Sequence, residues 1–319
     1  MMAKKQKNNI NPIEKRKNQK IKTDFLNSES KSVRLGDLNV ILPPNSMVRT
    51  GDKLIINEIN IKTTPKNGEL EELLFGAIKN CGDFDAVLVS GGIDSSIIAA
   101  IAMQIKRSCD LIAVGFGDSE DLKYADILGE NLKKKVSKVI IDDKEVIKII
   151  KKLKELDLDL YNVILGVVEF AALEYARSSG YKKVLSGLGS DELFFGFKKH
   201  KLLEPAQLEE FRESRLFYLS TTDLLRINKL SKFFAIKIDM PYLDESIVSY
   251  ALGLNIKGEV DSLYDKGLLR HIGKNLGLSE LLVARKKKAM QYGSGVVKSL
   301  ERLAKKEKIR NIGDFIKRI

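Results

Sequence analysis

Apolar positions after residue 85 follow two different spacings along the chain. Short continuous apolar runs have the length of buried β-strands, and the segments between them repeat apolar residues every three or four positions, as amphipathic helices do. The expected strands are residues 85–90, 110–117, 136–142 and 182–187. The expected helices are residues 97–107, 119–135, 143–156 and 166–178. Strands that alternate with helices are typical of a parallel sheet with crossover helices, so we predict an α/β fold with a doubly wound parallel sheet.

The rest of the chain divides into three parts. We expect residues 1–30 to form a basic disordered tail, because they are highly charged and offer little apolar surface to bury. Residues 31–66 contain short β-type runs broken by Pro and Gly, which predicts a small β hairpin. Residues 67–319 form the main domain, and strand signals nearly vanish after residue 204. We therefore expect the sheet to be followed by a helical C-terminal cap.

Cysteine content, apolar runs and charge exclude several classes of protein. Cys81 and Cys109 form no CxxC pair and there are 2 histidines, so neither a disulfide framework nor a Cys/His zinc site is expected. No apolar run of about 18 residues occurs, which argues against membrane insertion and favours a cytoplasmic protein. Of the net charge of +12, residues 1–22 supply eight Lys or Arg against Glu14. We interpret this tail as a solvated arm and do not expect a nucleic-acid partner.

A Ser-Gly-Gly turn joins the first expected strand to its helix in the stretch SGGIDSS, residues 90–96. Such turns are where open parallel sheets bind phosphates. Gly91 and Gly92 let the backbone bend so that its N–H groups face phosphate oxygens. The hydroxyl donors are Ser90, Ser95 and Ser96. A carboxylate repels phosphate unless a magnesium ion lies between them, so Asp94 is interpreted as a metal ligand, with a helix N-cap as the alternative.

The stretch VLSGLGSDELFFGF, residues 184–197, repeats this arrangement at the end of a later strand. Gly187 and Gly189 shape the turn, and Ser190 and Asp191 follow it. Two acidic turns at strand ends can hold one Mg-triphosphate between them. We therefore predict ATP and Mg²⁺ as the ligands of this edge of the sheet.

These motifs together resemble a known family. SGGIDSS is similar to the PP-loop of the ATP pyrophosphatases, which include NAD synthetase, GMP synthetase, argininosuccinate synthetase, tRNA thiolases and asparagine synthetase. LSGLGSDELFFGF resembles the second signature of asparagine synthetase and of β-lactam synthetase. MPYLDESIVSYAL, KGLLRHI and RKKKAMQYGSG resemble later segments of the same family, in the same order. The chain thus resembles the synthetase domain of asparagine synthetase over roughly residues 67 to 300.

The resemblance implies an ATP-dependent amide synthetase. The side-chain carboxylate of aspartate would attack the α-phosphate of ATP and release pyrophosphate, and ammonia would convert the β-aspartyl-AMP to asparagine. Carried over to this chain, Asp94 and Asp191 would hold magnesium on the pyrophosphate, and Lys287 would stabilise the transition state. The phosphate contacts would come from Ser90, Gly91, Gly92, Ser95 and Ser96. Without the resemblance, Lys287 would be interpreted as part of a solvated basic loop.

The resemblance also implies a general base for ammonia, supplied by a glutamate that precedes the second signature. Glu155 is the candidate, and it matches with a shift of one residue. Asp157 and Asp159 are the alternatives.

Other charged residues near the motifs have two possible roles. Lys266 and Arg270 lie one helical turn apart and are interpreted as a solvated helix face, with phosphate contact as the alternative. Asp244 is either a helix N-cap or part of the substrate pocket. Glu192 either complements the helix dipole or contacts substrate or pyrophosphate.

Two features differ from the family pattern. Glutamine-dependent asparagine synthetases begin with a nucleophilic cysteine and a glutaminase domain, whereas this sequence starts Met-Met-Ala-Lys and has no cysteine before Cys81. We therefore expect ammonia from solution or from a separate glutaminase subunit, and we interpret the hairpin at 31–66 as a remnant of that domain. Leu188 stands where the family usually has glutamate, which leaves another small carboxylic acid open as the substrate.

Two alternatives from other classes stay open. A PP-loop tRNA-modifying enzyme would explain the basic tail, but the paired cysteines of sulfur transfer are absent from the sequence. A non-catalytic relative of asparagine synthetase would explain Leu188, but Asp94, Asp191 and Lys287 are intact. NAD synthetase fits the first motif and not the second.

Overall fold

The computed structural model describes residues 68–254 and 266–319, together with short strands between residues 34 and 57. These strands form two antiparallel pairs, β1 (Arg34–Leu35) with β2 (Leu38–Asn39) and β3 (Ser46–Thr50) with β4 (Lys53–Asn57). The predicted basic tail, residues 1–30, lies outside the described residues. The division of the chain into tail, hairpin remnant and main domain stays a prediction.

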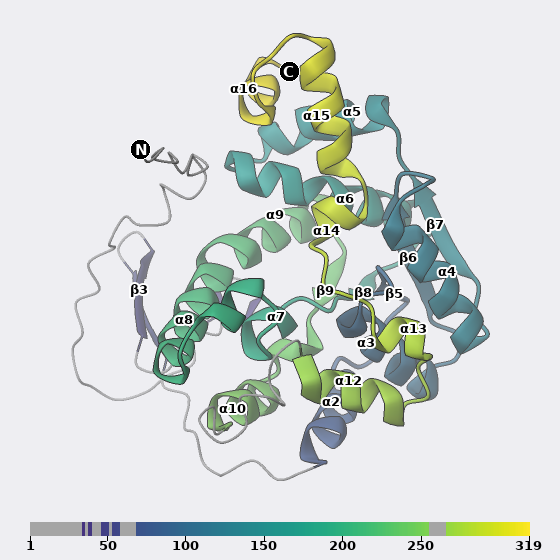
Figure 1. Ribbon diagram of the computed structural model, residues 1–319, viewed down its shortest axis with the longest axis vertical. Helices are drawn as coiled ribbons and strands as arrows, with labels where there is room; N and C mark the ends of the chain where they lie inside the picture. The colour runs from purple at the N-terminus through teal and green to yellow at the C-terminus, as the bar shows by residue number, and fades with distance from the viewer. Residues whose placement is uncertain (1–33, 36–37, 40–45, 51–52, 58–67, 255–265) are drawn as a thin grey trace, which may run out of the picture.

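A five-stranded parallel sheet forms the centre of the main body (Figure 1). Its strands are β5 (Ala86–Leu88), β6 (Asp110–Gly115), β7 (Val136–Ile140), β8 (Lys183–Leu185) and β9 (Lys237–Asp239). They lie in the order β7-β6-β5-β8-β9. The chain therefore runs outward from β5 to β7 and returns to the other side of β5 as β8. Ligands of open α/β sheets bind at such a switch point, here between the ends of β5 and β8.

Helices cover both faces of this sheet. Those before β8 are α2 (Glu69–Asn80), α3 (Ile93–Ile105), α4 (Glu120–Leu132), α5 (Asp143–Glu155) and α6 (Leu160–Ser178). Side chains of β6 alternate between two apolar clusters, as the two-residue period of a strand requires. Leu111 and Ala113 join the cluster that contains α3 and α4, and Ile112 joins the one that contains α5 and α6. The predicted doubly wound parallel sheet is thus confirmed.

The C-terminal half is mainly helical, as the sequence predicts. Between β8 and β9 lie α7 (Ser190–Leu193), the 3-10 helix η2 (Lys198–Leu202), α8 (Pro205–Tyr218), the π-helical turn η3 (Leu219–Asp223) and α9 (Leu224–Phe234). After β9 lie η4 (Pro241–Leu243), α10 (Glu245–Gly253), α12 (Gly267–Asn275), α13 (Glu280–Val283), α14 (Met290–Gly293), α15 (Val296–Lys306) and α16 (Ile312–Arg318). α10 and α12 extend the α3 cluster, and α9, α15 and α16 extend the α6 cluster.

Two elements differ from the expectation. The apolar pattern does not predict β9, because its three residues place one apolar side chain, Ile238, between Lys237 and Asp239. The helix expected at 166–178 begins earlier, at Leu160, since the Asp159 carboxylate caps it by accepting a hydrogen bond from the Asn162 backbone at 2.9 Å.

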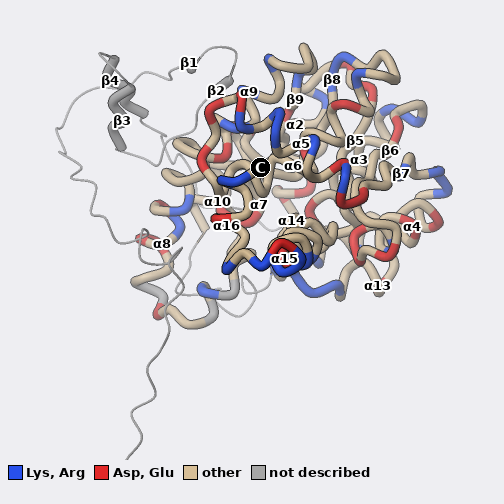
Figure 2. The backbone as a smooth tube through the Cα atoms, turned by 90° about the horizontal axis from the view of Figure 1, so that it is seen from above, with Lys and Arg blue, Asp and Glu red and all other residues tan. Residues whose placement is uncertain are grey.

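Apolarity and charge can be followed along the described residues. Within that part of the chain, no helix has the length and apolarity needed to span a bilayer. Basic and acidic positions are interspersed along the described backbone (Figure 2). The described residues therefore do not share the strong positive bias of residues 1–22.

Candidate functional site

The first turn of the site joins β5 to α3. Gly91 has φ +72° and packs so closely on α4 that a Cβ atom would lie 2.4 Å from the backbone of Tyr124. A side chain at this position would therefore be excluded both by the backbone conformation and by space. Gly92 then caps α3 with an extended backbone, so the first N–H groups of a 13-residue helix stay available to a ligand. No side chain caps this helix N-terminus at the end of β5, and such termini are common sites for anions.

The three serines of this turn have different environments. Ser90 lines the pocket, and its hydroxyl oxygen accepts a hydrogen bond from the Gly92 backbone at 3.3 Å. Ser95 is buried and donates to the Gly92 carbonyl at 3.2 Å, so its hydroxyl holds the turn together. Ser96 is fully buried, and its hydroxyl has no hydrogen-bond partner among the described residues. Phosphate contact by the side chains of Ser95 and Ser96 stays a prediction.

The second turn joins β8 to α7 and meets the first one. A Cβ atom on Gly187 would lie 3.1 Å from the backbone nitrogen of Ser95, so the two turns are in contact. Gly189 caps α7, which opens with Ser190 and Asp191. Tyr242, from the MPYLDE segment, is fully buried and donates its hydroxyl to the Asp94 carbonyl at 3.2 Å. The third motif therefore supports the first.

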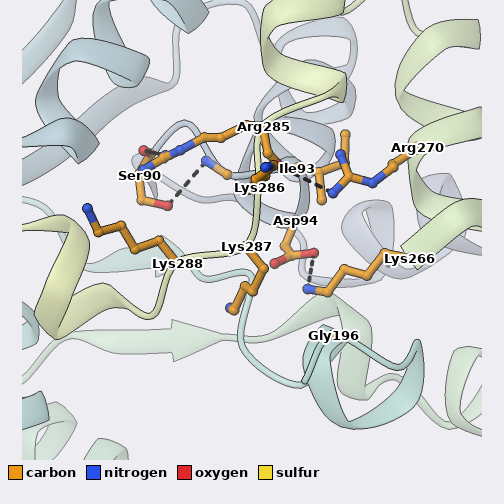
Figure 3. A pocket seen from close by; sticks show the side chains of 11 residues that line it. Ser90, Ile93, Asp94, Gly196, Lys266, Arg270, Arg285, Lys286, Lys287 and Lys288 are labelled. Carbon is orange, nitrogen blue, oxygen red and sulfur yellow. Dashed lines mark hydrogen bonds and ion pairs between the residues drawn. The ribbon is translucent and has the colours of Figure 1, made fainter. Parts of the chain in front are cut away.

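Two aspartates, one from each turn, share a buried lysine. The ammonium of Lys266 lies 2.5 Å from a carboxylate oxygen of Asp94 and 2.5 Å from one of Asp191. Lys287 pairs with the other oxygen of Asp191. Figure 3 shows the side chains of Lys266 and Lys287 pointing into the same space below Asp94. The structure thus brings Asp94, Asp191 and Lys287 together, as the motifs predict.

This cluster shifts the protonation of its members. Burial disfavours the charged form of Asp191, but Lys266 and Lys287 outweigh it and lower its pKa. Burial also disfavours the Lys287 ammonium, but the carboxylates of Asp191 and Asp94 raise its pKa. Next to them, burial and then the charge of Asp191 raise the pKa of Glu192, which lies 3.5 Å from Arg215. Asp191 and Lys287 are therefore both charged at neutral pH.

The pocket around this cluster is rich in cations. Its lining residues are Ser90, Gly92, Ile93, Asp94, Gly196, Lys266, Arg270, Arg285, Lys286, Lys287 and Lys288. Six of these eleven are Lys or Arg, as a site for a polyphosphate needs. Lys266 is 3% exposed, so its interpretation as part of a solvated helix face is wrong. Arg270 donates to the backbone carbonyls of Val283 and, at 3.1 Å, of Arg285, so it holds the lysine-bearing loop.

The general-base candidates lie apart from these residues. Glu155 is exposed at the last turn of α5, a helix that packs against α6 and α15, and it does not line the pocket. Asp159 is used as the N-cap of α6, and Asp157 is exposed. The role of Glu155 stays a prediction from the resemblance. Asp244 caps α10 through the Ser246 backbone at 3.0 Å, which gives the N-cap alternative.

Sequence reasoning missed two arginines, one that lines the pocket and one beside Glu192. Arg285 is buried and bridges the first turn to Asp121 on α4, although the RKKK run resembles a solvated loop. Arg215 lies over the rings of Phe197 and Tyr218. The sequence does not distinguish these arginines from exposed ones, because their burial and their partners arise only in the folded chain.

The site has the donors that magnesium prefers when it arrives with phosphate. One carboxylate oxygen of Asp94 and one of Asp191 each lie 2.5 Å from the Lys266 ammonium, so the two carboxylates face one position that this ammonium occupies. Within the described residues, no group of three or more His, Cys, Asp or Glu gathers to form an all-protein metal site. Mg²⁺ is commonly bound by one or two carboxylates together with substrate phosphates, so this pair fits that ion.

Comparisons with known proteins agree with the motifs. The asparagine synthase family model matches residues 69–216 and 203–310. A putative glutamine-hydrolyzing asparagine synthetase of Methanocaldococcus jannaschii is 30% identical over 82% of this chain and 57% of its own length. The human glutamine-hydrolyzing asparagine synthetase is 30% identical over 52% of this chain and 32% of its own length. The chain therefore spans about half, or less, of the curated relatives it matches.

Solved structures give a more distant likeness. A protein described as a predicted subunit of tRNA methyltransferase from Methanocaldococcus jannaschii is 18% identical, with a TM-score of 0.34 over 70% of this chain and 89% of its own. A score this low supports no conclusion about function. The extent of the family match, together with the two acidic turns and the lysine loop, is decisive: the chain belongs to the asparagine synthase family.

Proposed function

We propose that this protein is an ATP-dependent amide synthetase that forms an acyl-adenylate and pyrophosphate, with aspartate and ammonia as its substrates and asparagine as its product. The observation that supports this most is the meeting of Asp94, Asp191, Lys266 and Lys287 at the switch point of the sheet. Attack on the α-phosphate requires that the β- and γ-phosphates be held as a leaving group. Paired carboxylates for a metal, with cations beside them, supply that function.

Each part of the site has a role in this reaction. A carboxylate oxygen of the substrate bonds to the α-phosphorus of ATP, and the bond from that phosphorus to the bridging oxygen of the β-phosphate breaks. Backbone N–H groups at the start of α3 bind phosphate oxygens, and Lys287 neutralises the charge that develops on the departing pyrophosphate. Asp94 and Asp191 would hold Mg²⁺, which neutralises pyrophosphate charge when bound. Ammonia then bonds to the acyl carbon, AMP leaves, and the nitrogen loses a proton.

The identity of the substrates rests on the family. Relatives named as glutamine-hydrolyzing asparagine synthetases support aspartate as the acid. Ammonia would reach the site from solution or from a separate glutaminase subunit. Leu188, which is half-buried in the second turn, leaves another small carboxylic acid as the alternative substrate.

The products test this proposal. The purified protein is incubated with ATP, Mg²⁺, ammonium and aspartate, or with other small carboxylic acids in place of aspartate. We expect acid-dependent formation of AMP and pyrophosphate, which Asp94→Asn and Lys287→Met both abolish. ADP and inorganic phosphate as the products would exclude an acyl-adenylate. A matched control is Lys298→Met, because Lys298 is 77% exposed and does not line the pocket.

A further inference from the structure

The loop that carries Lys287 has no regular secondary structure of its own. Residues 285–289 lie between α13 and α14 and belong to no helix or strand. Lys287 nevertheless reaches Asp191 on the far turn. A side chain that must meet a transition state has to be held in place before the reaction, since disorder there costs rate. Arg270 holds the start of this loop from α12, and Arg285 holds it through its own side chain.

Arg285 fastens the loop to two other elements. One end of its guanidinium donates to the Ser90 carbonyl in the first turn. The other end donates to a carboxylate oxygen of Asp121 at 2.6 Å, and the guanidinium lies 4.2 Å from the centre of the Tyr124 ring. The side chain of Arg285 is 3% exposed. A buried, forked and stacked guanidinium fixes both direction and distance, which a lysine ammonium cannot do.

The first turn of α4 is the support for these contacts. Asp121 and Tyr124 lie one helical turn apart on α4. The Asp121 carboxylate also packs against Gly293, where a Cβ atom would lie 2.1 Å from it. Gly293 lies in α14, directly after the loop, and Gly91 of the first turn packs on the Tyr124 backbone. One turn of α4 therefore contacts the first turn, the start of the lysine loop at Arg285, and α14, the helix that follows the loop.

We propose that Arg285 is a positioning residue, anchored by Asp121 and Tyr124, that clamps the lysine loop to the first phosphate-binding turn and so holds Lys287 at the reacting phosphates. Its catalytic consequence rests on the proposed function. Arg285 acts through Lys287 rather than on the substrate. Because misplacing a reactive group by about 1 Å can lower the rate about 100-fold, loss of the clamp should lower kcat by roughly 10- to 100-fold.

Hydrogen exchange of the free protein tests the clamp without any assumption about the reaction. We expect amides of residues 284–293 to exchange at least several-fold faster in Arg285→Lys and in Asp121→Asn than in the wild type. Arg302→Lys is the matched control, because Arg302 pairs with Asp143 at 2.5 Å and lies 6.0 Å from the Phe116 ring but is outside the pocket. Unchanged exchange of this loop in folded Arg285→Lys and Asp121→Asn would overturn the clamp.

Pyrophosphate release tests the positioning role. In Arg285→Lys, kcat should fall while KM for ATP changes little, and the same substitution should cause no further loss in a Lys287→Met background. An equal loss in both backgrounds would show that Arg285 does not act through Lys287. If the wild type releases no pyrophosphate, the proposed function and this catalytic role fail together, while exchange still decides whether the clamp exists. Tyr124→Leu replaces Arg285→Lys if the latter does not fold.

Discussion

Replacing Lys266 with methionine should destabilise the ligand-free protein, because Lys266 neutralises two partly buried carboxylates. The side chain of Lys266 is 3% exposed and contacts Asp94 and Asp191 at 2.5 Å each. Methionine keeps most of the length and removes the charge, so Asp94 is left without this cation while Asp191 keeps Lys287. Breaking a buried ion pair costs about 3 to 5 kcal/mol. Because the two carboxylates are 15% and 20% exposed, we expect the lower end, about 3 kcal/mol.

Urea unfolding with and without Mg²⁺ measures this prediction. In the wild type, Mg²⁺ alone should change the free energy of unfolding little, because the ammonium of Lys266 already contacts both carboxylates. In Lys266→Met, Mg²⁺ should restore about 2.7 kcal/mol at 100 times its dissociation constant. Lys229→Met, which removes an exposed ion pair with Asp157, should show neither effect. Equal stabilisation of wild type and Lys266→Met by Mg²⁺ would refute the reasoning.

Three further substitutions test parts of the structure. Gly91→Ala should lose about 3 kcal/mol of stability in urea unfolding, because φ is +72° and the new Cβ would clash with α4, whereas Gly117→Ala, with open space around it, should lose far less. Tyr242→Phe should lose about 1 kcal/mol, because the Asp94 carbonyl loses a buried donor, and an unchanged unfolding midpoint would contradict that hydrogen bond. Burial lowers the pKa of His200 to about 4, so the folded protein binds a proton there less tightly than the unfolded chain. The free energy of unfolding that His200 contributes should therefore be fully present above about pH 6.5, and about 3 kcal/mol of it should be lost as the pH falls toward 4. In His200→Asn, the free energy of unfolding should change less with pH over this range.

The sheet could be predicted from the sequence because its central strands are apolar and its helices are amphipathic. β6 is buried on both faces from Leu111 onward, so the residues after Asp110 appear as one continuous apolar run. β9 has no such local signal, since Lys237–Asp239 is a strand only through its pairing with β8. The hydrophobic pattern of a short segment does not show which distant segment it will pair with.

The candidate site was predictable to the extent that local motifs encode it. The two acidic turns could be identified because a strand end, glycines and an aspartate stand together in each. The burial of Lys266 and Arg285 could not be identified, because it arises when the helical half folds back onto the ends of β5 and β8. The resemblance implied Glu155 as the general base only through its spacing from the second signature. The structure places that side chain at an exposed helix end.

The most direct test of the proposed reaction follows one oxygen atom. Aspartate labelled with oxygen-18 in its side-chain carboxylate is incubated with the protein, ATP, Mg²⁺ and ammonium, and the phosphorus products are analysed by mass spectrometry. If the carboxylate attacks the α-phosphate, one labelled oxygen must leave with AMP, and pyrophosphate must stay unlabelled. Label in inorganic phosphate, or AMP without label, would contradict the acyl-adenylate mechanism.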